Sequence, residues 1–74
     1  MYIILEMQTN GNTTAVVPPT TKEDYDEAQS VWHSILASAA ISSVEKHTAM
    51  IIGEDGEVYE NRCYYHSPPP PNAP

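Results

Sequence analysis

The sequence predicts a small α+β domain of ββαββ order, in which a four-stranded antiparallel sheet carries one amphipathic helix on one face. Two segments rich in β-branched and apolar residues are each divided by a hairpin turn signal, Asn10-Gly11 in the first and Asp55-Gly56 in the second. Between these hairpins, apolar residues recur at helical spacing from Tyr25 to Ala39. This layout follows because an isolated hairpin is marginal and needs a surface on which to pack.

Length and composition indicate one domain, residues 1–66, followed by a proline-rich tail, residues 67–74. A chain this short buries only about 60% of its unfolded surface, so such domains often depend on disulfides, metals or partner subunits. The only cysteine, Cys63, has no internal partner and favours a reducing compartment. We therefore expect a homo-oligomer. The tail is typical either of a disordered segment or of an extended arm that docks on a neighbouring subunit or an aromatic groove.

The net charge of −7, from ten acidic and three basic residues, argues against broad binding to nucleic acid, whose phosphates carry the same sign of charge. The N-terminal segment, residues 1–6, lacks the basic region of a signal peptide. No stretch approaches the roughly 20 apolar residues that a membrane helix needs. The sequence therefore predicts a soluble intracellular protein that binds neither nucleic acid nor membrane.

The first hairpin is expected to pair residues 2–8 with residues 13–17. Asn10-Gly11 suits a type I′ turn, in which both central residues have positive φ. Pro18-Pro19 is expected to end the second strand and to place it at an edge, because proline donates no hydrogen bond to a ladder. The cleaner apolar face of the first strand consists of Ile3, Leu5 and Met7.

The helix is expected to begin within residues 20–24 and to end near Ala40. Thr20 with Glu23, or Thr21 with Asp24, fits a capping box at its start. The apolar stripe predicted to pack on the sheet consists of Tyr25, Ala28, Trp32, Ile35, Leu36 and Ala39. A neighbouring helix face carries small residues and is either lightly exposed or a subunit contact. Its members are Ser30, Ser34, Ala37, Ser38 and Ile41.

The second hairpin is expected to pair residues 46–52 with residues 57–65 around a two-residue Asp55-Gly56 loop. This register has a polar face and an apolar face, and the apolar face is expected to meet the helix. The apolar face pairs Thr48 with Cys63, Met50 with Asn61, and Ile52 with Tyr59. The polar face, predicted to point away from the helix, gathers His47, Glu60, Arg62, Tyr64 and His66.

Neither a metal site nor a catalytic nucleophile is predicted. Cys63-x-x-His66 resembles a pair of metal ligands, but residues three apart in a strand point to opposite faces. A structural zinc site also requires four converging ligands. Because Cys63 is expected to face the helix, its thiol lacks the exposure of a reactive thiolate. We therefore expect a protein without catalytic activity, metal or cofactor.

Binding of a small ligand is the chemistry that the remaining residues favour. Tryptophan and tyrosine rings stack on planar rings, and Arg62 binds a phosphate or carboxylate through two parallel hydrogen bonds. Ser42 follows the helix and offers a hydroxyl. The predicted ligand-binding residues are Trp32, His33, Ser42, His47, Arg62, Tyr64 and His66. The alternative is that the polar residues of the sheet only face solvent and that His33 is a boundary or subunit-contact residue.

The stretch HSILASAAISSVEKHTAMI, residues 33–51, resembles a group of small uncharacterised proteins encoded by prophages of gut Firmicutes. The opening YIILEMQTN and the segment CYYH, residues 63–66, belong to the same resemblance, which covers most of residues 2–66 but not residues 13–19 or the tail. The shared pattern consists of His33, Ala39-Ala40-x-Ser42, His47, Gly56, Cys63-Tyr64 and His66. No established activity comes with this group.

The resemblance implies a phage protein in the cytoplasm of a bacterial host. Small acidic phage proteins are commonly inhibitors, decoys or particle accessories, and one class, the "sponge" proteins, sequesters nucleotide immune signals of the host between subunits. By this analogy, we expect a non-catalytic binding protein that sequesters a nucleotide-derived signalling molecule at a subunit interface. The alternative is an acidic protein–protein interaction module: a host-protein inhibitor, a nucleic-acid mimic or a virion accessory protein. It would use Glu23, Asp24, Asp26 and Glu27.

Overall fold

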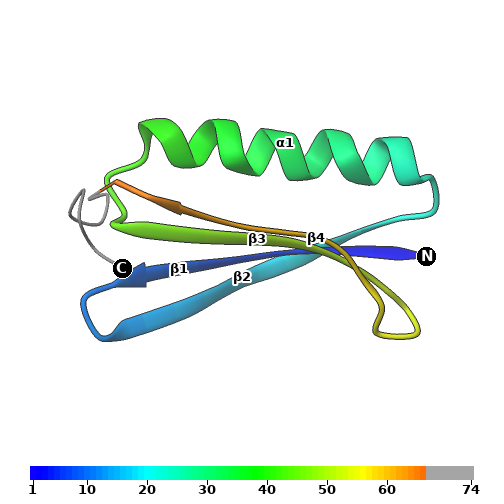
Figure 1. Cartoon of the computed structure of the whole chain (residues 1–74), viewed down its shortest axis with the longest axis horizontal. Coiled ribbons are helices and arrows are strands. Elements are labelled where there is room, and N and C mark those ends of the chain that lie inside the picture. The colour runs from blue at the N-terminus through cyan, green and yellow to red at the C-terminus, as the bar shows by residue number, and fades with distance from the viewer. Residues whose placement is uncertain (67–74) are drawn as a thin grey trace, which may run out of the picture.

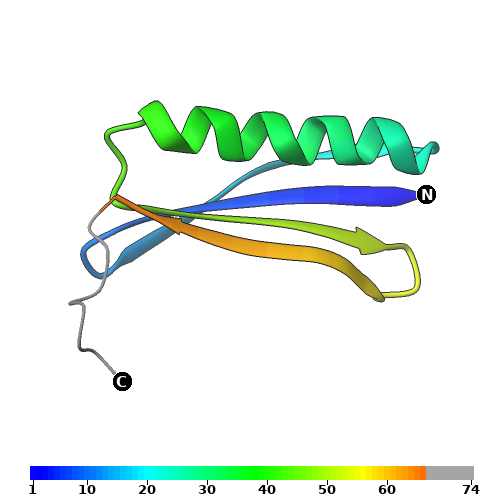
Figure 2. The ribbon, with the colours of Figure 1, turned by 45° about the horizontal axis from the view of Figure 1, so that its top comes forward.

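The computed structural model describes residues 1–66 and has the predicted α+β fold of ββαββ order. Its elements are β1 (Tyr2–Asn10), β2 (Thr13–Lys22), α1 (Tyr25–Ile41), β3 (Lys46–Gly53) and β4 (Val58–Tyr65). The four antiparallel strands form an open sheet in the order β2-β1-β3-β4 (Figure 1). Figure 2 shows α1 running along one side of this sheet. The predicted proline-rich tail, residues 67–74, lies outside the described residues.

The turn between β1 and β2 is one residue later than predicted. Asn10 pairs with Thr13, so the two loop residues are Gly11 and Asn12. Gly11 has a φ of +57°, and no residue other than glycine has positive φ within residues 1–66. Positive φ at the first central residue alone is typical of a type II′ turn, so the predicted type I′ turn is wrong. Asn10 stays extended, and its side chain accepts a hydrogen bond from the backbone of Glu45 at 3.0 Å.

Pro18-Pro19 does not end β2, which continues to Lys22. The two prolines lie at a register shift, where they stand opposite Leu5 between the pairs Glu6–Val17 and Ile4–Thr20. A bulge on an edge strand tolerates proline because the missing N–H groups are not needed for the ladder. β2 is an edge strand, as predicted.

The helix begins later than either predicted capping box. Thr20 and Thr21 belong to β2, where they pair with Ile4 and Ile3. The N-cap is Asp24, whose side chain accepts a hydrogen bond from the backbone N–H of Asp26 at 2.9 Å. The sheet takes the threonines because β1 offers them complete backbone pairing, and an aspartate is an equally good cap. The predicted end near Ala40 agrees with the observed last residue, Ile41.

The turn between β3 and β4 has a three-residue loop, residues 54–56, and not the predicted two-residue loop. Gly53 N–H donates to the carbonyl of Glu57 at 2.8 Å, and Gly56 N–H donates to the carbonyl of Gly53 at 2.9 Å. Gly56 has a φ of +88°. A turn followed by a left-handed glycine is the common three-residue hairpin, so the glycine here follows the turn instead of forming its centre.

A bulge at Tyr59 offsets the extra loop residue. Ile52 pairs with Val58 and Ile51 pairs with Glu60, which leaves Tyr59 without a cross-strand partner. Tyr59 therefore does not pair with Ile52, contrary to prediction. From Ile51 onward the predicted register is correct, because the loop and the bulge shift it in opposite directions.

α1 covers the opposite sheet face from the one predicted, so the predicted face assignment is wrong. Ala49 and Ile51 are buried beneath α1 together with Ile4, while Met50 points away from the helix. The indole of Trp32 packs here, and its Nε1–H donates to the carbonyl of Ala49 at 3.0 Å. A large ring needs a small residue opposite it, and alanine provides that space.

The core between α1 and the sheet is small. Of the predicted helix stripe, Ala28, Trp32 and Ala39 are buried. Ile4 and Ile51 are the only large side chains buried completely within residues 1–66. Three tyrosine rings close the end of this core beside the helix N-terminus. The ring centroid of Tyr2 lies 5.2 Å from that of Tyr25 and 5.3 Å from that of Tyr59, and the centroids of Tyr25 and Tyr59 are 5.8 Å apart.

The sheet face away from α1 is called the open face below. Its residues alternate with those beneath the helix and are paired across the strands. Its central residues on β1 and β3 are Ile3, Leu5, Met7, Thr48, Met50 and Ile52. Its outer residues on β2 and β4 include Val16, Asn61, Cys63 and Tyr65.

Candidate functional site

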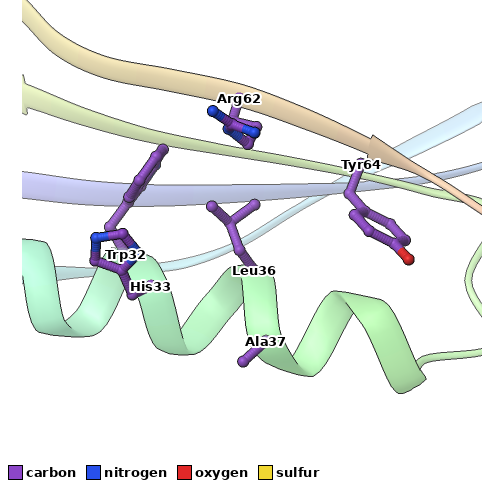
Figure 3. Close-up of a pocket in the computed structure, with 6 residues that line it drawn as sticks. All are labelled: Trp32, His33, Leu36, Ala37, Arg62 and Tyr64. Atoms are coloured by element: carbon purple, nitrogen blue, oxygen red, sulfur yellow. The ribbon is translucent and has the colours of Figure 1, made fainter.

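A groove of about 440 Å³ lies between α1 and β4 and is called the α1–β4 groove below. Pockets that hold small molecules commonly have about 300–1,000 Å³. Figure 3 shows the side chains from α1 on one side and those from β4 on the other. The lining residues are Trp32, His33, Leu36, Ala37, Arg62 and Tyr64.

Helical and strand periodicity bring these residues together. Leu36 and Ala37 follow Trp32 and His33 by one helical turn, so the four form one wall. Arg62 and Tyr64 are two apart in β4 and therefore project from the same face of the sheet. The groove joins α1 to an edge strand, where no further strand competes for the space.

Arg62 is the only lysine or arginine among the described residues that line the groove. It has no ion pair and no side-chain hydrogen bond among residues 1–66, although the chain carries ten acidic residues. The preceding acid on this face, Glu60, accepts a hydrogen bond from Gln29 at 2.8 Å instead. The guanidinium is therefore free to bind an anion that enters the groove.

The aromatic residues of the groove differ in what they offer. Trp32 is only 5% exposed and is held by its bond to Ala49, so it presents an edge and not a full stacking face. His33 is exposed, with its ring 5.0 Å from the indole. Tyr64 is 36% exposed, and its ring centroid lies 5.3 Å from that of His66. Tyr64 and His33 are thus the rings available for stacking on a ligand.

Four of the predicted ligand-binding residues line the groove: Trp32, His33, Arg62 and Tyr64. The other three lie elsewhere. Ser42 is the C-cap of α1, and its hydroxyl accepts a hydrogen bond from the backbone of Val44 at 3.1 Å. His66 stands beside Tyr64 at the end of the strand pair, where its backbone N–H donates to Glu45.

His47 lies on the sheet face that α1 covers, and it is buried, with only 2% of its surface exposed. Its Nδ1 lies 2.8 Å from Oε2 of Glu6, and Glu6 also accepts a hydrogen bond from Gln8 at 3.2 Å. Nε2 of His47 has no hydrogen-bond partner among residues 1–66. His47 therefore belongs to the interior and not to the lining of the α1–β4 groove.

Leu36 and Ala37 line the groove and were absent from the predicted site. The sequence predicts Leu36 in the apolar stripe of the helix and Ala37 in its small-residue face. The signal that identifies them is their spacing, four residues after Trp32 and His33. They give the groove an apolar wall.

Cys63 lies on the open face and is exposed, so the prediction that it faces the helix is wrong. The hydroxyl of Thr48 is 3.6 Å from its sulfur. His66 lies on the other face, and no group of three or more His, Cys, Asp or Glu side chains within residues 1–66 is arranged to hold a metal ion. In the part of the chain that the structure describes, no helix is long and apolar enough to cross a membrane.

Seven acidic residues gather at the end of the molecule where α1 begins and β3 turns into β4 (Figure 1). This acidic end consists of Glu23, Asp24, Asp26, Glu27, Glu54, Asp55 and Glu57. The ammonium group of Met1 lies 3.0 Å from Glu54 and 3.8 Å from Glu23. Its hydrogen bond to Glu54 raises the pKa of this ammonium group above the ordinary value. Partial loss of water contact, followed by repulsion from Glu57 and Asp55, raises the pKa of Tyr59.

The groove has the chemistry of a binding site. Among residues 1–66 its lining offers one arginine, two rings available for stacking and an apolar wall, and the imidazole of His33 is its only candidate for a general base. No family model, curated protein or solved structure matches this chain.

Proposed function

We propose that this protein is a non-catalytic binding protein that sequesters a nucleotide-derived signalling molecule in the α1–β4 groove. The observation that carries the proposal is Arg62, which has no acidic partner among residues 1–66 in a chain of net charge −7 and lies beside Tyr64 and His33. An unpaired guanidinium next to exposed rings fits a ligand that has both an anionic group and a planar ring.

Each part of the groove supports one part of such a ligand. Arg62 would hold phosphate oxygens through two parallel hydrogen bonds. Tyr64 and His33, from opposite sides, would stack on the base, and Leu36 would contact its edge. All these residues come from one copy of the chain, so the groove does not need the subunit interface that the sequence analogy implies.

The biological setting is part of the same proposal. The resemblance to prophage proteins suggests action in the cytoplasm of a bacterial host, where sequestration requires binding and release but no chemical step. A defence signal made of nucleotides has a phosphate and a base, the two chemical features to which an arginine and exposed rings are complementary.

The first test is a fluorescence titration, because Trp32 is the only tryptophan and lines the groove. The probes are adenosine monophosphate, a cyclic dinucleotide and inorganic phosphate. We expect the nucleotides to change Trp32 emission, and Arg62→Gln to weaken their binding by about 10- to 100-fold, because hydrogen bonds to charged groups contribute about 1.5–3 kcal/mol. Lys22→Gln is the matched control, since it removes the same charge from β2, the opposite edge of the sheet.

Two results would contradict the proposal. One is equal weakening in Arg62→Gln and Lys22→Gln, which would show only a general charge effect. The other is no response to any nucleotide, together with native mass spectra that show no bound mass on protein purified from cells carrying bacterial defence systems. Binding of inorganic phosphate as tightly as of nucleotides would show that the rings contribute nothing.

A second candidate function is protein–protein interaction through the acidic end. It is favoured by one observation, namely that seven of the ten acidic residues share one end of the molecule. Such a surface would mimic nucleic acid or bind a basic partner. Because its charges are exposed, binding through the acidic end should weaken steeply with salt, whereas binding in the α1–β4 groove should weaken less.

A further inference from the structure

The open face is the more apolar face of the sheet. Along β1 and β3 it pairs Ile3 with Ile52 and Leu5 with Met50. These side chains are half-buried only by one another, because α1 lies on the other side (Figure 2). The helix side, by contrast, contains several polar groups: Glu6, His47, Glu60 and Arg62. A two-layer fold that leaves its more apolar sheet face in water is expected to have a further partner.

No acidic side chain lies on the open face. Glu6 and Glu60 are in strands but on the helix side, and the other eight acids are in α1, the turns and the connection before β3. Lys46, near Tyr65 at one end of β3, is the only charged residue of this face within residues 1–66. Two copies of a chain with net charge −7 repel one another over most of their surfaces, so this face is where they approach at the lowest electrostatic cost.

The dimensions of the open face also suit a second copy. Its strands have eight to ten residues and are therefore about 26–33 Å long, and four strands about 4.8 Å apart span about 19 Å. This is about 500 Å² on each copy and about 1,000 Å² for a pair, the lower limit of a specific interface. Because the core beneath α1 contains, within residues 1–66, only two large side chains that are buried completely, Ile4 and Ile51, a second apolar layer adds substantially to it.

We propose that the open face is the contact surface of a homodimer, in which two copies of this chain pack sheet against sheet with α1 on each outer side. A two-fold axis brings the same patch together on both copies, and sheets packed in this way align within about 30°. The inner layer then contains Leu5, Met7, Met50 and Ile52 from each copy. The α1–β4 groove of each copy stays on the outer, helix-bearing side, so dimerisation and ligand binding are separate properties.

The test is sedimentation equilibrium of the full chain from low micromolar to submillimolar concentration. We expect the mean mass to rise from one chain to two. Met50→Glu should remain a single chain throughout, because pairing would bury two unpaired carboxylates in an apolar layer. Ser34→Glu is the matched control: it adds the same charge to the small-residue face of α1, and it should dimerise like the unmodified protein.

Thr48→Glu keeps the test decisive if Met50→Glu fails to fold, because it replaces a polar residue at the centre of the same face. Far-ultraviolet circular dichroism and the emission of Trp32 report whether each variant is folded. A single chain at every concentration would overturn the proposal. So would folded Met50→Glu and Thr48→Glu variants that still dimerise, or loss of the dimer in Ser34→Glu, which would place the contact on the helix.

Discussion

On one face of the sheet, one polar side chain is buried and hydrogen-bonded while another remains available to a ligand. His47 and Arg62 both lie on the helix side of the sheet, on neighbouring strands. His47 is enclosed and bonded to Glu6, whereas Arg62 borders the α1–β4 groove and has no acidic partner among residues 1–66. The difference follows from position, since β3 is a central strand and β4 is an edge. A polar residue at the centre needs an internal partner, while one at the edge remains available to a ligand.

Tyr59 provides a prediction about pH. Its raised pKa means that the folded protein retains the phenolic proton to higher pH than the unfolded chain does. The stability that depends on the neutral phenol is therefore complete below about pH 10 and is lost as the pH rises through the raised pKa. We expect the urea midpoint to fall as the pH rises above about 10, and to fall less in Tyr59→Phe, which keeps the ring.

The Tyr59→Phe comparison isolates one group. The raised pKa of the Met1 ammonium group also lowers stability as the pH rises above about 8, but it does so equally in both proteins. Absorbance of tyrosinate at 295 nm should show one late-titrating phenol in the unmodified protein that is missing in Tyr59→Phe. Parallel loss of stability in the two proteins would contradict the assignment to Tyr59.

The secondary-structure elements show where sequence patterns are reliable. Strand alternation and helical spacing predicted all five elements, because burial enforces these periods over many residues. The ends of elements were less predictable. Thr20, Thr21 and Asp24 are all competent caps, and only the pairing of the threonines with β1 selects Asp24. Likewise, Pro18-Pro19 predicts the end of a strand, because the sequence alone does not reveal the bulge opposite Leu5.

The observed cap leads to a prediction about α1. Asp24→Ala should lower the free energy of unfolding by about 1 kcal/mol, because the backbone N–H of Asp26 loses its acceptor. Thr21→Ala, at one of the two predicted caps, removes no observed cap and should cost less than about 0.5 kcal/mol. Urea denaturation followed by circular dichroism measures both. A larger loss in Thr21→Ala than in Asp24→Ala would contradict the observed helix start.

Four of the six residues that line the α1–β4 groove were expected from the sequence to bind a ligand, whereas Leu36 and Ala37 were not. The predicted register, which is correct from Ile51 onward, put Arg62 and Tyr64 on one face. Helical spacing put Trp32 in the buried stripe and His33 about 100° from it, yet both border the groove. The choice of face was wrong, because hydrophobicity favoured the side of Met50 for the core. The small size of Ala49, which admits the indole of Trp32, is a packing effect that a hydrophobic pattern does not express. A groove within one chain therefore appears where a groove between subunits was expected.

At the scale of the whole molecule, charge is distributed unevenly. The acidic end carries seven carboxylates, while the open face carries none. Like charges at one end repel one another and lower the stability of the folded state. The same arrangement keeps the ends of two molecules apart and leaves the open face as the surface of closest approach.

This distribution predicts how stability responds to salt. Added sodium chloride should raise the thermal midpoint by screening the acidic end. Glu57→Lys should raise the midpoint at low salt by about 2–4 °C and should reduce the further gain from salt. Glu45→Lys makes the same change of charge in the connection before β3, at the opposite end, and should have a smaller effect (Figure 1). Equal effects of the two substitutions would show that net charge, and not its location, limits stability.

The loop at residues 54–56 and the bulge at Tyr59 together determine which conformational changes this hairpin tolerates in evolution or design. At the same chain length, a two-residue loop without the bulge would give the register that is observed from Ile51 onward. A change in only one of the two would move the β4 side chains beyond the bulge by one position, exchanging Arg62 and Tyr64 for their neighbours on the open face. Deletion of Tyr59, by contrast, would leave a regular ladder and keep the groove. Substitutions that favour a two-residue turn should therefore preserve the groove only when they also remove the bulge, much as a second frameshift restores a reading frame.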